Sequence, residues 1–140
     1  MKAQSSTRWM LAILLLLSGV GFVQAESKRH EAATAIVRDL QDALLASMKA
    51  GNSLDFSQRR QRLHPVVERT HHFRAITRFI LGRHSDSLEE QQLAEVAEHL
   101  LRLSVVEYTS RFNRYNNERL RVLDTEAMAA ERVRVETELI

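Results

Sequence analysis

Cysteine is absent from this 140-residue chain, which contains one proline and four glycines. Without cysteine there can be no disulfide bridge, no thiolate nucleophile and no cysteine-ligated zinc or iron–sulfur site. Gly51 and Gly82 each follow a helical pattern and are interpreted as helix stops, so no glycine-rich loop is left to cradle a phosphate. Stability must therefore come from the apolar core, or from a ligand.

A large excess of charge of one sign is also missing. The net charge of +2 becomes zero without Lys2 and Arg8, because 20 − 2 = 18 basic residues then face 18 acidic ones. Along the rest of the chain arginines are interleaved with Asp and Glu, which is typical of solvated helical faces and not of a surface that follows phosphates. We expect no nucleic acid among the partners.

Signatures of catalysis and of metal binding are lacking as well. The chain has neither G-x-S-x-G nor H-E-x-x-H. The adjacent His71 and His72 would point about 100° apart on a helix, so solvated or capping roles are favoured over a metal site. The paired carboxylates Glu89 and Glu90 suit the positive end of a helix better than acid–base chemistry. We expect a protein that is not an enzyme and carries no cofactor.

Residues 1–25 have the features of a secretory signal peptide. Two basic residues precede the short apolar run 9–17, and Val23 and Ala25 are small residues at the expected cleavage positions. A membrane anchor is the alternative, but the apolar run is shorter than the roughly 20 residues that a spanning helix needs. We predict cleavage after Ala25, export to the periplasm, and one domain over residues 26–140.

Apolar residues at helical spacing predict helices over 28–50, 55–62 and 65–81, the third opened by Pro65. A long helix begins near Leu88, because residues 86 and 89, and residues 87 and 90, both fit the capping-box spacing. The residues expected on its apolar face are Leu93, Val96, Ala97, Leu100, Leu103, Ser104 and Tyr108.

Beyond Asn117 the pattern changes to alternation, which predicts strands at 120–123 and 132–140. The connection 124–131 is rich in alanine and could hold a turn of helix. The expected class is α+β, with amphipathic helices packed on a curved antiparallel sheet that is incomplete in this chain. Two strands alone are marginal and need further strands or a partner.

The sequence resembles the MlaC or toluene-tolerance family in four places. These are R-F-I-L-G-R-H at 78–84, the pair Gln91-Gln92, the later aromatic residues Tyr108, Phe112 and Tyr115, and Pro65-Val66-Val67. That resemblance implies a periplasmic phospholipid-binding shuttle, which maintains outer-membrane lipid asymmetry or solvent tolerance. Its implied partners are phospholipid, an inner-membrane ABC transporter complex and an outer-membrane lipoprotein complex. A branch linked to hopanoid synthesis is also implied.

The same resemblance implies which residues contact the acyl chains. The expected lining consists of Phe79, Ile80, Leu81, Val96, Leu100, Leu103, Val133 and Val135. Family members carry further strands and a terminal helix after the second strand, so the chain is expected to be truncated at its C-terminus. From the residues alone, these apolar positions fit an ordinary core as well as a cavity. The alternative function is a helical periplasmic adaptor that completes its sheet with a partner chain.

Overall fold

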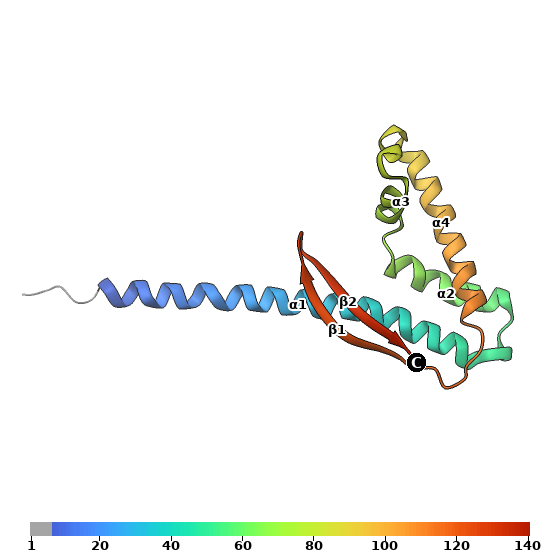
Figure 1. The fold of residues 1–140 in the computed structure, drawn as a ribbon, viewed down its shortest axis with the longest axis horizontal. Coiled ribbons are helices and arrows are strands. Elements are labelled where there is room, and N and C mark those ends of the chain that lie inside the picture. Colours follow the sequence, from blue (N-terminus) through green and yellow to red (C-terminus); the bar gives the residue numbers. More distant parts are fainter. Residues whose placement is uncertain (1–6) are drawn as a thin grey trace, which may run out of the picture.

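The computed structural model describes the backbone of residues 7–140 and the side chains from Gln24 onward. The predicted signal peptide therefore falls almost wholly outside the residues whose side chains are described, and it stays a prediction. The helices and strands are α1 (Thr7–Ala50), α2 (Phe56–Thr70), α3 (Phe73–Leu81), α4 (Glu90–Arg111), β1 (Leu120–Met128) and β2 (Arg132–Leu139). This order confirms the α+β class with an incomplete sheet (Figure 1).

Helix α2 begins as the sequence predicts and ends later than expected. The Asp55 side chain accepts a hydrogen bond from the backbone N–H of Gln58, and the Gln58 side chain accepts one in return, which completes a capping box. The prediction that Pro65 opens a new helix is wrong, because Pro65 lies inside α2. An internal proline costs about 3 kcal/mol, and burial of Val66 and Val67 against the core offsets that cost.

The chain breaks instead at His71 and His72, between α2 and α3. His71 adopts an extended backbone conformation, and the ring of His72 accepts a hydrogen bond of 3.1 Å from the backbone N–H of Ala75. His72 is thus the N-cap of α3, in line with the capping role that the sequence favoured. At the other end Gly82 has a φ of +54°, which confirms it as a helix stop.

Helix α4 starts two residues later than predicted. Residues 82–87 form a 3₁₀ turn, and the capping box joins Glu89 to Gln92 instead of either pair that the sequence suggested. The glutamine side chain accepts from the Glu89 backbone N–H at 2.9 Å. Acidic Glu89 and Glu90 therefore lie at the positive end of the helix, as expected from the helix dipole.

The core lies where α4 meets α2 and α3. The residues of α4 that it buries recur at every fourth position, and they are Leu93, Ala97, Leu101, Val105 and Thr109. Part of the predicted apolar face is thus wrong, since Val96 and Leu103 remain 39% and 59% exposed. Ridges of side chains four residues apart pack into the grooves of neighbouring helices, which selects this stripe.

Strands β1 and β2 form an antiparallel hairpin with a bulge between Val122 and Asp124. The expected helical turn in 124–131 is absent from this described segment, because β1 continues to Met128 and only 129–131 form the turn. Pairing with β2 orders this longer strand, because among its added residues only Thr125 is β-branched. The helix that packs on the hairpin is α1, and His30 of α1 bonds Thr125 of β1 at 2.8 Å.

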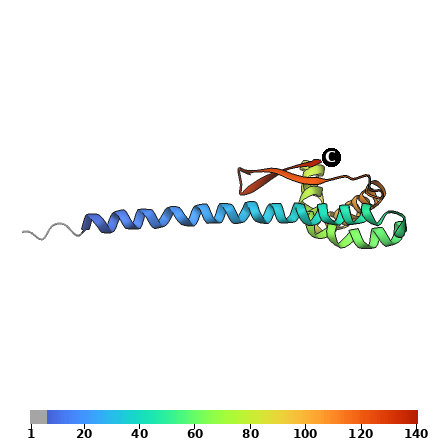
Figure 2. The same cartoon turned by 90° about the horizontal axis from the view of Figure 1, so that it is seen from below.

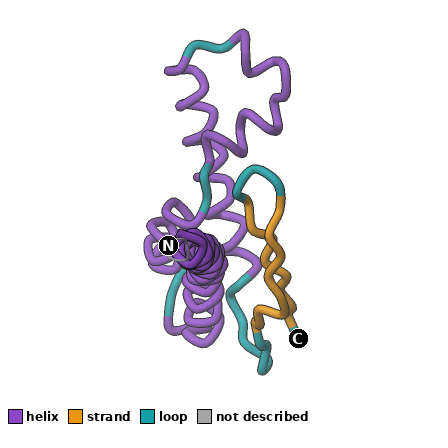
Figure 3. The backbone as a smooth tube through the Cα atoms, turned by 90° about the vertical axis from the view of Figure 1, so that its left-hand side faces the viewer, coloured by secondary structure: helices purple, strands orange, loops and turns teal. Residues whose placement is uncertain are grey.

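The hairpin and the α3–α4 pair occupy different places in the fold. Figures 1 and 2 both show the hairpin lying along α1. Figure 3, which looks along α1, shows α3 and α4 extending away from α1 and from the hairpin. Within the described part of the chain, no helix has both the length and the apolar character needed to cross a membrane.

Candidate functional site

One side of the α3–α4 pair is charged. Arg74 and Arg78 lie one turn apart on α3, and both donate hydrogen bonds to the carboxylate of Glu90 at the start of α4. Arg74 also lines an open groove of about 490 Å³, together with Ala94 and Glu98 of α4. These contacts fix which side of α4 lies beside the arginines of α3.

The other side of the pair is apolar and open to solvent. Phe79 and Ile80 at the end of α3 are 88% and 63% exposed. At about 100° per residue, Val96, Leu100 and Leu103 lie within about 60° of one another on α4 and almost opposite Glu98. Phe79 and Ile80 likewise lie away from the arginine side of α3. We name Phe79, Ile80, Val96, Leu100 and Leu103 the apolar surface.

The members of the apolar surface differ in how far they reach into the core. Leu100 is half-buried and packs against the core cluster that contains Phe73 and Leu101. Leu103, one turn further along α4, is 59% exposed. Leu81, also expected to line the site, is half-buried at the end of α3. Single exposed apolar residues are ordinary on a protein surface, whereas several large ones on one pair of helices are a candidate for binding.

The strand residues of the expected lining lie elsewhere. Val133 and Val135 are half-buried, and they share a face of the hairpin with Thr125, whose hydroxyl bonds His30 of α1. The hairpin packs on α1, whereas α3 and α4 pack on each other and α4 on α2. Helical geometry therefore places Val96, Leu100 and Leu103 on one side of α4, whereas the two valines lie on the hairpin, which packs on α1.

A cluster of rings holds α3 against α4, and only the helical spacing of Phe73 and Tyr108 indicates it in the sequence. The His71 ring lies 5.4 Å from the Phe73 ring and 5.8 Å from the Tyr108 ring, measured between centroids. One nitrogen of His71 bonds the carbonyl oxygen of Val67 at 2.9 Å, and the other bonds the Tyr108 hydroxyl at 3.2 Å. Burial raises the pKa of Tyr108 above its ordinary value.

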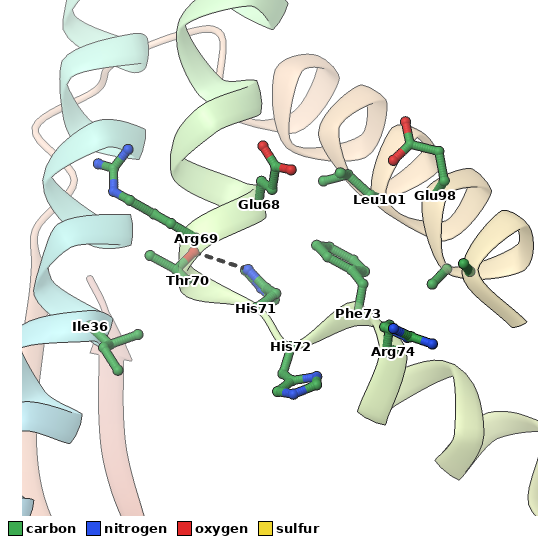
Figure 4. Close-up of a pocket in the computed structure, with 12 residues that line it drawn as sticks. Ile36, Glu68, Arg69, Thr70, His71, His72, Phe73, Arg74, Glu98 and Leu101 are labelled. Carbon is green, nitrogen blue, oxygen red and sulfur yellow. Dashed lines mark hydrogen bonds between the residues drawn. The ribbon is translucent and has the colours of Figure 1, made fainter. Parts of the chain in front are cut away.

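This cluster borders the groove on the charged side of the α3–α4 pair. Figure 4 shows Phe73 beneath Leu101 of α4, the His71 ring bonded to Thr70, and Ile36 of α1 across the groove. The lining mixes carboxylates, arginines and imidazoles with a few apolar side chains. Among the residues with described side chains, no group of three or more His, Asp or Glu could hold a metal ion.

The structure is that of an α+β protein with large exposed apolar side chains on α3 and α4. The family model described as MlaC protein matches residues 38–140, which is well over half of the chain, and the chain therefore belongs to the MlaC family. The matched region contains every residue of the expected lining. Neither the curated proteins nor the solved structures include a significant match.

Proposed function

We propose that this chain binds phospholipid and carries it through the periplasm, with the acyl chains held on the apolar surface of α3 and α4. The proposal rests on one observation in a chain of the MlaC family. The large apolar side chains of Phe79, Ile80 and Leu103 are mostly exposed to solvent, and they lie away from the charged side of the α3–α4 pair. Covering them with acyl chains removes apolar area from water, at about 25 cal/mol per Å².

The charged side of the pair complements this arrangement. Arg74, Arg78 and Glu90 tie the two helices together on one side, so the other side keeps its shape without burying its own apolar groups. The role is binding and not catalysis. The partners that we propose are an inner-membrane ABC transporter complex, which exchanges lipid with the chain, and an outer-membrane lipoprotein complex at the other end of the route.

Val133 and Val135 belong to the proposed site as its strand half. Their face of the hairpin is half-covered by packing on α1. Contact with lipid there requires the hairpin to move from α1 towards the α3–α4 pair. The helical half needs no such movement, because its side chains are already open to solvent.

The proposal is tested by the lipid that co-purifies with the protein. The chain is exported in a bacterial host, purified from the periplasm, and its lipid extract is measured by mass spectrometry. We expect about one phospholipid per chain for the unmodified protein. Leu103→Asp places a charge against the acyl chains, and we expect it to lower the lipid content about tenfold or more.

Ala94→Asp is the matched control, because it adds the same charge at an exposed position on the charged side of α4. It should leave the lipid content unchanged. Leu103 is preferred to Leu100 for the test, since Leu100 packs on the core and its loss would mix folding with binding. A folded wild-type protein without lipid, or equal lipid in the two variants, would refute the proposed surface.

A further inference from the structure

The outer edge of β2 has a charge pattern that is complementary to itself. Within the described residues β2 pairs with β1 alone, so its other edge carries no strand. The strand reads R-V-R-V-E-T-E-L from Arg132 to Leu139. Two arginines precede Val135 at alternate positions, and two glutamates follow it at alternate positions. A second copy of β2, running antiparallel about Val135, would therefore set each arginine opposite a glutamate.

The backbone of β2 has the right phase for such a pairing. Arg119 and Ile140 exchange both backbone hydrogen bonds, at 2.9 and 3.0 Å, so the N–H and C=O of Ile140 face β1. In an antiparallel ladder these groups alternate in direction from one residue to the next. The N–H and C=O of Val133, Val135 and Thr137 consequently face outward, where a second strand would bind them.

These outward groups match the same two-fold arrangement. With Val135 opposite Val135 of the other copy, residue 133 lies opposite residue 137, and all of these positions offer outward hydrogen-bonding groups. The charged pairs 134 with 136 and 132 with 138 then fall at the positions between them. There the side chains of neighbouring strands approach most closely, which suits ion pairs.

The pairing inside the hairpin leaves one of these charges badly placed. Glu136 lies directly opposite Asp124 of β1, and like charges in that position destabilise a sheet. No ion pair of Glu136 is found within the described part of the chain, while Arg134 bonds Glu126 at 3.0 Å. A second copy would bring its Arg134 beside Glu136 and relieve this repulsion.

From the register, the backbone phase and the charge pattern, we infer that two copies of this chain pair through β2, antiparallel and centred on Val135, to form one four-stranded sheet. Sheets of three or more strands are far more stable than an isolated hairpin. Helix α1 packs more extensively on β1 than on β2. The inference does not depend on lipid binding.

Charge reversal tests the pairing. Light scattering and sedimentation equilibrium are run over a wide range of concentration, with the mass of one chain taken from mass spectrometry of the same preparation. We expect twice that mass for the unmodified protein. Glu136→Arg or Arg134→Glu alone changes two symmetry-related pairs from attraction to repulsion, and each should weaken the dimer about tenfold or more.

The double variant Arg134→Glu with Glu136→Arg restores opposite charges across the axis and should recover the dimer. Glu95→Arg is the control, since it reverses an exposed charge on α4, which extends away from the hairpin. It should leave the dimer intact. Circular dichroism verifies that each variant is folded. A monomer at every concentration, or a dimer that neither single reversal weakens, overturns the inference.

Cysteine cross-linking tests the register independently, because the chain has no cysteine of its own. Val135→Cys places a thiol on the two-fold axis, so a short bismaleimide should link two copies in high yield. In Leu139→Cys the thiols would lie about 26 Å apart along the strands, given about 3.3 Å per residue. Equal yields at the two positions would exclude this register.

Discussion

Helix α4 carries two apolar stripes of similar composition, and they have different surroundings. Leu93, Ala97 and Leu101 lie on the stripe that α2 and α3 cover, where each is at most 5% exposed. Val96 and Leu103 lie on the stripe that faces solvent. Residue type does not separate the two. What distinguishes the proposed lipid-binding surface from the core is therefore its exposure to solvent and not its hydrophobicity.

Truncation of one leucine from each stripe gives the largest expected contrast. Leu101→Ala opens a cavity in the core, and we expect it to lower the free energy of unfolding by about 2–5 kcal/mol. Leu103→Ala removes an exposed side chain and should change stability by no more than about 0.5 kcal/mol. Urea denaturation followed by circular dichroism measures both. Equal losses would show that the two stripes are not distinct.

Loss of a hydrogen bond in the cluster of His71, Phe73 and Tyr108 should have an intermediate effect on stability. Tyr108→Phe removes the hydroxyl that bonds His71 at 3.2 Å, so the half-buried imidazole loses a partner. We expect the free energy of unfolding to fall by about 1 kcal/mol. Tyr115→Phe is the control, because the Tyr115 hydroxyl has no part in this cluster. If both tyrosine variants unfold at the same urea concentration, the hydrogen bond does not support the α3–α4 arrangement.

The smallest expected effect on stability comes from the ion pair that joins α1 to α2. Arg69 donates to both carboxylate oxygens of Asp39, at 2.7 and 2.8 Å, and this hydrogen bonding lowers the pKa of Asp39. The pair therefore stabilises the fold above the ordinary carboxyl pKa of about 3.9. That stabilisation is lost as the pH falls through the lowered pKa of the folded state.

Asp39→Asn should accordingly reduce stability slightly at neutral pH, because both partners are partly exposed and solvent screens the pair. The difference from the unmodified protein should shrink as the pH falls below about 4 and disappear below the lowered pKa of the folded state. Thermal unfolding at several pH values measures it, with Asp42→Asn as the control for a nearby exposed carboxylate. A difference that grows as the pH falls would contradict the assignment.

Much of the fold could be predicted from the sequence, because local signals are strong in this chain. Gly82 ended a helix as expected, Asp55 capped one, and alternation placed the second strand. Pro65 misled the prediction, since a long apolar stripe kept α2 helical through it. The extension of β1 to Met128 was missed because Asp124, Glu126 and Ala127 have low strand propensity, and pairing with β2 supplies the order.

The candidate site was predictable only in part. Periodicity identified the apolar residues of α4 but not which stripe would be buried, because that depends on where α2 and α3 pack. The family resemblance separated Val96 and Leu103 from the core residues beside them. The placement of Val133 and Val135 along α1 depends on contacts between distant segments, such as that of His30 with Thr125, which no local pattern specifies.

Photo-cross-linking at two positions of α4 tests the central claim most directly. A benzophenone amino acid is introduced at Leu103 on the exposed stripe, or at Glu98 on the opposite, charged side, in protein that carries phospholipid. After illumination, intact mass spectrometry detects covalent lipid adducts. The apolar surface predicts an adduct from position 103 and none from position 98. An adduct from position 98 alone would contradict it.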